Sequence, residues 1–217
     1  MKNFRSLAID GGAGTGKSTL SNLISDKNNY LYVETGSHYR ALTWMMMGTG
    51  VEPEQIDKYL ESNSISIDSK IFKNKAFITI NGQSFSKEEL RSPEVNRNVS
   101  RYAAIPALRK LLFDYQRSQV ELAKKSVFNG AILEGRDIGT KILPEADLKI
   151  FLWADLEIRE HRRSSDGETD SIISRDQMDT NRKEAPLLCA ERAIKIDTGQ
   201  FSRDEVYEQV VNALGLL

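Results

Sequence analysis

The chain has 217 residues and a mass of 24.5 kDa, with 40% hydrophobic and 28% charged residues, which is enough apolar material for one sizeable core. A formal net charge of -1 excludes a basic field over the whole chain, so we expect no nucleic-acid or membrane-surface partner. The single cysteine, Cys189, cannot form an internal disulfide. With no signal-peptide pattern after Met1 and no apolar run near the roughly 18 residues of a membrane helix, we expect a cytoplasmic protein.

The first half of the chain alternates between strand and helix patterns. Its first apolar run stops at glycines, after which apolar residues return at helical spacing, so we expect a strand, a glycine loop and a helix. Further on, apolar residues alternate around Asn81-Gly82, which is a strong hairpin signal and predicts a small antiparallel insert. The expected elements are strands at 6–10 and 30–33, helices at 17–26, 38–47 and 54–61, and the insert at 65–85.

The second half also contains helix and strand patterns, and in addition a charge-rich segment. A long helical pattern over 94–128 contains Pro106, where we expect a break. Three β-type runs separated by helical or charged segments predict parallel strands with crossover connections. Residues 157–182 are dense in charge and poor in apolar side chains, so we expect a solvated, mobile excursion. The expected strands lie at 131–133, 148–152 and 193–196, and the last helix at 205–214.

Residues 11–18 fit the pattern G-x-x-x-x-G-K-S/T between a predicted strand and a predicted helix. Glycines let backbone N–H groups wrap a phosphate, Lys17 bridges the β- and γ-phosphates, and the Ser18 hydroxyl ligates Mg²⁺. We therefore expect the loop to bind a nucleoside triphosphate, with Mg²⁺ as the cofactor. The predicted ATP-binding residues are Gly11, Gly12, Ala13, Gly14, Thr15, Gly16, Lys17, Ser18 and Thr19, with Ser18 as the metal ligand.

A phosphate loop alone fits either a kinase with an acceptor site or an NTPase that works as a switch or motor. The guanine reader N-K-x-D and the switch element D-x-x-G of GTPases are both missing from the sequence. A motor ATPase usually has a strand that ends in Asp or Asp-Glu, whereas this chain has the lone Glu134, followed by Gly135 and Arg136. An acceptor phosphate needs such an arginine, so the pattern favours a kinase.

Further motifs are spread along the chain at 9–19, 34–43, 92–95, 135–140, 149–154, 175–182, 186–187 and 196–198. In this order they resemble the bacterial-type cytidylate kinases over the length of the chain. The resemblance implies an α/β fold with a five-stranded parallel P-loop sheet flanked by helices, a small antiparallel β insert and a short lid. It implies one domain with a core at 1–36, 101–156 and 183–217, an NMP-binding region at 37–100 with the insert at about 64–90, and a lid at 157–182.

The resemblance also implies the reaction, transfer of a phosphoryl group from ATP to CMP or dCMP by a monomeric enzyme. UMP or AMP as acceptor, and a P-loop NTPase without kinase activity, remain alternatives. Guanidinium groups suit the acceptor phosphate, and a carboxylate, a hydroxyl and an arginine suit cytosine. The implied CMP-binding residues are Arg40 and Arg136 at the phosphate, Asp179, Ser100 and Arg109 at the base, Asp137 and Arg175 near the sugar, and Thr35, Tyr39 and Arg182 around them.

Catalysis is expected from Lys17 together with lid arginines. The catalytic candidates are Arg159, Arg163 and Arg175, and Arg162 and Arg182 are further lid candidates. Structural roles also remain open for some site residues. Arg109 has an ion-pair or surface alternative, Asp137 could orient Arg136, and Asp179 could pair with Arg175 or Arg182.

Four features depart from the family pattern. Glu34 stands where Asp is usual, Gly12 where Pro is usual and His38 where an apolar residue is usual. We expect His38 to form a pocket wall or to be solvated. The stretch 164–174 is shorter than the lid of the family. Nothing required for the chemistry is missing.

Overall fold

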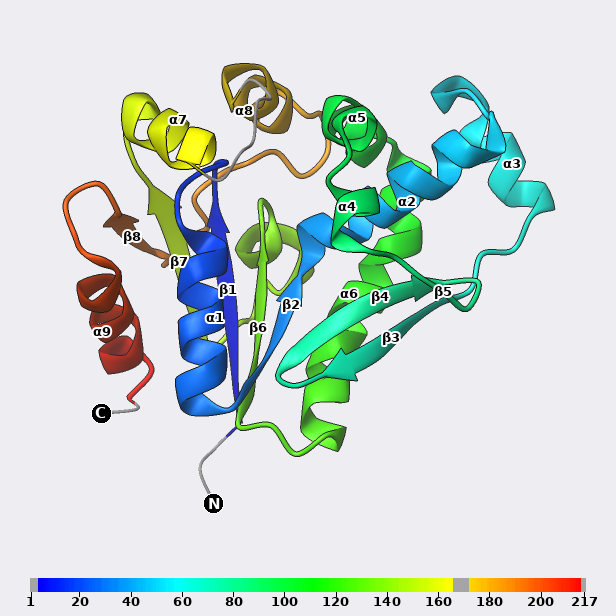
Figure 1. The fold of residues 1–217 in the computed structure, drawn as a ribbon. Coiled ribbons are helices and arrows are strands. Elements are labelled where there is room, and N and C mark those ends of the chain that lie inside the picture. Colours follow the sequence, from blue (N-terminus) through cyan, green and yellow to red (C-terminus); the bar gives the residue numbers. More distant parts are fainter. Residues whose placement is uncertain (1–3, 166–171, 216–217) are drawn as a thin grey trace.

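A computed structural model of the protein describes residues 4–165 and 172–215, and a largely parallel sheet forms its middle layer (Figure 1). The strand order is β3-β4-β2-β6-β1-β7-β8, with β5 paired to β4. The predicted parallel strands are all present and run in one direction. They are β1 (Arg5–Gly11), β2 (Tyr30–Glu34), β6 (Gly130–Gly135), β7 (Leu148–Trp153) and β8 (Ile194–Asp197).

Helices connect these strands. The predicted break near Pro106 is confirmed: Ile105 has an extended backbone and Pro106 begins a new helix, as the lack of an N–H on proline favours. The helices are α1 (Lys17–Asn28), α2 (Thr35–Thr49), α3 (Ile56–Ser62), α4 (Lys87–Leu90), α5 (Pro93–Ala103), α6 (Pro106–Lys125), α7 (Leu156–Ser165), α8 (Ile172–Thr180) and α9 (Arg203–Ala213), with short turns η1 (Pro53–Gln55) and η2 (Ile138–Ile142).

Alternating side chains of β1 cover both faces of the sheet, because successive residues of a strand point to opposite sides. Leu7 and Ile9 pack in one core cluster with residues of α1 and α9. Ala8 lies in the other cluster, with residues of α6 and η2. The sheet is therefore buried between two helical layers, and its carboxyl edge is left free for a site.

The insert consists of β3 (Ile67–Phe72), β4 (Lys75–Ile80) and β5 (Gln83–Ser84). The predicted turn at Asn81-Gly82 is confirmed, and both residues have positive φ, 50° and 78°, as a type I′ hairpin requires. A second tight turn, at residues 73–74, joins β3 to β4 and was not predicted. Beyond the antiparallel pairing, β4 lies parallel to β2, so the insert extends the main sheet.

The charge-rich segment after β7 contains the helices α7 and α8, for which no helix was predicted. Helix α7 buries none of its residues, and α8 buries Ile172 and Asp179. The expected small contribution of this segment to a core is therefore confirmed, and the mobility of the segment stays a prediction. In Figure 1, α7 and α8 lie at the end of the molecule to which β1 and β7 point. Much of the short-lid departure, at 166–171, lies outside the described residues.

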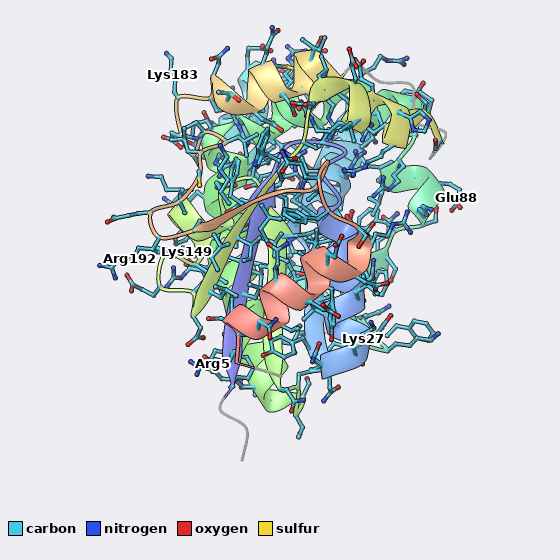
Figure 2. All side chains as sticks on the ribbon, turned by 90° about the vertical axis from the view of Figure 1, so that its left-hand side faces the viewer. Arg5, Lys27, Glu88, Lys149, Lys183 and Arg192 are labelled. Atoms are coloured by element: carbon cyan, nitrogen blue, oxygen red, sulfur yellow. The ribbon has the colours of Figure 1, made fainter. Side chains whose placement is uncertain are left out.

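Charged side chains surround the fold. Figure 2 shows Glu88, Lys183 and Arg192 pointing away from the ribbon at the edge of the molecule. Within residues 4–165 and 172–215, no helix is both long enough and apolar enough to cross a membrane.

Candidate active site

A cavity of about 1230 Å³ lies where the phosphate loop meets residues of 37–100, the expected NMP-binding region, and of 157–182, the expected lid. Its wall contains Ala13 to Thr19, residues of α2 and α5, and the end of β6. Arginines from five helices, α2, α5, α7, α8 and α9, and from connecting segments lie on its wall, which gives it the charge that phosphate groups require. The predicted site residues on the wall are Ala13, Gly14, Thr15, Gly16, Lys17, Ser18, Thr19, Thr35, Tyr39, Arg40, Ser100, Arg136, Asp137, Arg163, Arg175, Asp179 and Arg182.

The phosphate loop joins β1 to α1 in a conformation that its glycines permit. Gly14 and Gly16 have φ of 74° and 86°, which disfavours any residue with a Cβ. A Cβ on Gly11 would come within 2.2 Å of the carbonyl oxygen of Leu152. Gly11 and Gly12 are not on the cavity wall, so they contribute to the conformation of the loop rather than to the surface of the cavity.

Lys17 closes the loop on itself. Its Nζ donates to the carbonyl oxygens of Gly11 and Gly12 at 2.9 and 2.7 Å. Burial lowers the pKa of Lys17 to about 7, and the nearby Arg136 adds to the effect. A phosphate at this position supplies a stronger acceptor than a carbonyl, and its charge favours the protonated lysine.

Ser18 and Glu134 form a hydroxyl–carboxylate pair beside Lys17. Ser18 Oγ donates to Glu134 Oε1 at 2.7 Å, and Ser21 Oγ donates to Oε2 at 3.1 Å. Burial, and then the charge of Glu34, raises the pKa of Glu134. A cation bound beside Glu134 would therefore stabilise its charged form. The pair has the oxygen ligands that Mg²⁺ prefers. Sequence reasoning noted Glu134 only as a lone acid at a strand end.

Asp10 is a second buried carboxylate that sequence reasoning missed. It accepts hydrogen bonds from the backbone N–H groups of Ile138 and Gly139 at 2.9 and 2.7 Å. Burial raises its pKa to about 6, against the effect of these bonds. Asp10 thereby fixes the segment after Asp137 against the strand that leads into the phosphate loop. The signal in the sequence was the position of Asp10, which follows an apolar run directly and so indicates a carboxylate at the end of a buried strand.

Arg40 reaches the cavity from α2. Its Nη1 donates to the carbonyl oxygen of Leu90 at 2.9 Å and to Oδ1 of Asn96 at 2.6 Å. The guanidinium is thus held at the start of α5, whose residues Asn96 and Ser100 also line the cavity. Asn96 was not predicted, and nothing in its sequence context sets it apart from a solvated helix residue.

Asp179 lies between two arginines. Its Oδ2 accepts from Arg136 Nε at 2.9 Å, and its Oδ1 lies 3.4 Å from Arg182 Nη2. The structural alternative with Arg182 is therefore present in the structure. The contact with Arg136 was not predicted, and it brings the expected base reader and the expected phosphate ligand together. Asp179 is buried, so its charge depends on these partners.

Arg109 forms a buried ion pair with Asp137 and also donates to the carbonyl oxygen of Ala103 at 3.2 Å. Its guanidinium lies 5.5 Å from the centre of the Tyr39 ring, a cation–π distance. Asp137 and Tyr39 are on the cavity wall, but Arg109 is not. The expectation that Arg109 itself faces the base is not met in this structure, since its guanidinium is engaged behind the wall. Asp137 pairs with Arg109 rather than orienting Arg136.

The end of β2 connects the core to the NMP-binding region. Glu34 forms ion pairs with Lys75 at 3.0 Å and Arg91 at 3.1 Å. Thr35 Oγ1 donates to the carbonyl oxygen of Glu134 at 2.7 Å. Glu34, the departure from the usual Asp, therefore connects β2 with β4 and with the residue after α4.

Among the lid arginines, Arg162, Arg163, Arg175 and Arg182 line the cavity, whereas Arg159 does not. Arg162 donates to the Thr198 carbonyl at 2.7 Å. Arg159 is directed to the outer side of the phosphate loop, where it pairs with Asp176. In this arrangement Arg159 does not reach the cavity, whereas the catalytic role predicted for it requires a side chain on the cavity wall.

His38 is neither solvated nor a cavity residue, so that expectation was wrong. It is completely buried, its ring contacts Tyr115 edge-on at 5.0 Å, and within the described residues neither ring nitrogen has a hydrogen-bond partner. Burial lowers its pKa to about 3, so the ring is neutral at pH 7. His38 points from α2 toward Tyr115 of α6, whereas Tyr39 and Arg40 of the same helix point to the cavity.

A phosphate loop between β1 and α1, on the wall of a cavity that arginines also line, defines a P-loop protein. The cytidylate kinase family model matches residues 7–215. Cytidylate kinases of Clostridium tetani and Oceanobacillus iheyensis are 39% and 36% identical to the chain; the alignments cover 94% and 99% of it and 91% and 95% of the relatives. The chain belongs to the cytidylate kinase family and is an ATP-dependent kinase.

Among solved structures, a deoxyadenosine kinase from M. mycoides superposes with a TM-score of 0.49 and 12% identity, covering 98% of this chain and 100% of that one. A shikimate kinase from Acinetobacter baumannii gives a TM-score of 0.44 and 12% identity, with 98% and 94% covered. Likeness of this degree carries no functional argument.

Proposed function

We propose that the protein transfers the γ-phosphoryl group of ATP to CMP or dCMP. The observation that carries the proposal is a single cavity whose wall contains both the phosphate loop and the arginines Arg40 and Arg136, with Arg136 close to Lys17. A cavity that can hold a donor phosphate at the loop and an acceptor phosphate at the arginines suits direct transfer between two nucleotides. A switch or motor NTPase needs only the donor end.

The chemistry requires little covalent work from the protein, because phosphoryl transfer depends on positioning and on neutralisation of charge. Lys17 would hold the transferring group at the donor end. Arg163 and Arg175, both on the cavity wall, would offset charge as it moves between the nucleotides. Arg40 and Arg136 would hold the acceptor phosphate, and the Ser18 hydroxyl and Glu134 would hold Mg²⁺. The metal supplies neutralisation of the β- and γ-phosphate charge when bound.

The acceptor base would be recognised by Asp179 and Ser100, both buried residues on the cavity wall. A carboxylate accepts from the cytosine amino group, which uracil lacks. Asp137 and Tyr39 would contact the nucleotide near its sugar, and Arg109 would hold both from behind. We propose the core, NMP-binding region and lid with the boundaries expected from the sequence, and a monomeric, cytoplasmic enzyme.

A coupled assay of ADP release against CMP, dCMP, UMP and AMP tests the proposal. ADP release should be slow with ATP and Mg²⁺ alone and should rise by orders of magnitude with CMP or dCMP. UMP or AMP as the preferred acceptor would replace the proposed substrate while leaving a kinase. Equal rates with and without any acceptor would instead identify an NTPase.

A further inference from the structure

We propose that Asp176 is a positioning residue through which occupation of the ATP site tightens binding of the acceptor nucleotide. The proposal rests on the donor and acceptor ends assigned above and concerns how they communicate. Asp176 lies on α8, outside the cavity wall, and has no role in the function proposed so far. Its contacts are made with the backbone of the phosphate loop.

At the donor end, Asp176 Oδ1 accepts a hydrogen bond from the Ala13 N–H at 3.3 Å, and its Oδ2 pairs with Nη1 of Arg159. The same Nη1 donates to the Ala13 carbonyl at 3.2 Å, and Arg159 Nε donates to the Ala154 carbonyl at 3.0 Å. The ion pair thus binds both backbone polar groups of Ala13. Side-chain exposures of 14% for Arg159 and 21% for Asp176 place it in a partly desolvated position, where ion pairs are stronger than on the surface.

The loop is shaped to receive this pair. A Cβ on Gly12 would come within 3.0 Å of Arg159 Nη1 and 3.2 Å of Asp176 Oδ2. A Cβ on Gly14 would come within 2.9 Å of the Arg159 carbonyl oxygen. The lid helices therefore lie against the loop itself, and a movement of the loop displaces the partners of Asp176.

At the acceptor end, α8 carries Asp179 three residues further on. Residues at i and i+3 lie on the same face of a helix, so both carboxylates point from α8 toward the core. Asp179 binds Arg136 at 2.9 Å, and both residues line the cavity. Because a helix moves as a rigid unit, the position of Asp176 on the loop constrains the position of Asp179 at the acceptor site.

The consequence is a coupling between the phosphate loop and the acceptor site that runs through α8, separately from any residue that touches both nucleotides. A nucleotide bound by the loop fixes Ala13, which holds Asp176 and, through α8, holds Asp179 where the acceptor needs it. Asp176 also lies close enough to Lys17 for its charge to act on that lysine. Coupling of this kind is reciprocal, and its usual size is about 5- to 150-fold in affinity.

The test is calorimetric titration of CMP with and without Mg²⁺ and a non-hydrolysable ATP analogue. In the wild type, the analogue should lower the Kd for CMP by about fivefold or more. In Asp176→Asn, that factor should fall below about twofold, while the Kd measured without the analogue stays within about twofold of wild type. A purely structural role for Asp176 would change the melting temperature and leave the factor intact.

Two further variants make the result decisive. Arg159→Lys keeps the charge but cannot bind several acceptors at once, so it should also lower the factor. Gln177→Ala, on an exposed neighbour of Asp176, should keep the wild-type factor. A wild-type factor in folded Asp176→Asn and Arg159→Lys, or no coupling in the wild type, overturns the proposal. Absence of any CMP binding by the wild type contradicts the acceptor site itself.

Discussion

Nε of Arg136, at the end of β6, donates a 2.9 Å hydrogen bond to Oδ2 of Asp179 on α8. The arginine proposed to hold the acceptor phosphate and the carboxylate proposed to contact its base therefore bind each other in this structure. A nucleotide that engages both groups must replace this bond with its own contacts. Because Asp179 is buried and its other partner, Arg182, lies 3.4 Å away, removal of Arg136 leaves the carboxylate with that longer contact alone.

The first prediction separates base recognition from phosphate binding. CMP should exceed UMP in kcat/KM by about tenfold or more, since an unmatched buried group costs about 1–3 kcal/mol and 1.36 kcal/mol is a factor of ten. Asp179→Ala should reduce this ratio to about twofold, mainly through CMP. Arg40→Ala should weaken both acceptors alike. An unchanged ratio in a folded Asp179→Ala enzyme would make the carboxylate a structural partner of Arg136 and Arg182.

The second prediction concerns Lys17. Lys17→Met should abolish transfer and raise the stability of the nucleotide-free protein by about 1 kcal/mol or more near pH 7, because it removes a buried charge. The folded pKa of about 7 lies below the ordinary 10.5, so between these values the unfolded chain binds the extra proton. The gain in stability should therefore shrink as the pH rises through this range. Urea unfolding at several pH values measures it, and a loss of stability would contradict the electrostatic account.

The third prediction concerns Glu134. Glu134→Gln keeps the shape of the side chain but removes its charge, so the Mg²⁺ concentration for half-maximal activity should rise by about tenfold. Excess Mg²⁺ should restore a large part of the rate. The raised pKa of Glu134 also means that protons compete with the metal, so the wild type should need more Mg²⁺ as the pH falls. A Mg²⁺ titration identical to that of the wild type would remove Glu134 from the metal site.

The fourth prediction concerns His38. His38→Leu should stabilise the fold by about 1–2 kcal/mol, since it removes a buried polar ring without partners among the described residues. The folded pKa of about 3 lies below the ordinary 6.5, so the unfolded chain binds the proton between these values, and stability is lost as the pH falls through this window. That loss should be smaller in His38→Leu. Thermal melting between these pH values decides the question, and activity near wild type serves as the control.

The parallel strands and the phosphate loop could be predicted from the sequence because each depends on a local pattern. Apolar runs bounded by glycines define β1 and β6, and the spacing from Gly11 to Ser18 defines the loop. The turn between β3 and β4 was missed because neither of its residues, Lys73 and Asn74, is a glycine. Lys73 nevertheless has a φ of 53°, a value that favours glycine. Pairing of β4 with β2 has no local signal, since it depends on where a distant strand lies.

The site shows the same division. Most of the residues predicted from motifs line the cavity, although Gly11, Gly12, Arg109 and Arg159 do not. The pairing of Asp179 with Arg182 was weighed from the sequence, whereas other pairs were not foreseen. The pairs Arg109 with Asp137 and Arg136 with Asp179 join elements that are 28 and 43 residues apart in the sequence. No helix was predicted in the lid because its sequence is dense in charge and poor in apolar residues; polar contacts with the loop, such as that between Asp176 and the Ala13 N–H, hold it instead. Ion pairs of this kind leave no periodic trace in a sequence.

The turn at Asn74 gives the insert one fixed end. The Asn74 side chain donates to the Ser25 carbonyl at 3.0 Å, Ser25 Oγ lies 3.2 Å from the Asn74 carbonyl, and the neighbouring residues of β4 pair with β2. The opposite end of the hairpin lies toward α3, far from this attachment (Figure 1). The insert is also attached to α6, because Ser69 Oγ of β3 donates to Gln119 Oε1 at 3.0 Å, and Ile78 and Ile80 of β4 share a core cluster with Leu108 and Leu112. With one attachment to α1 and another to α6, the insert is held at two separate places and has no single hinge.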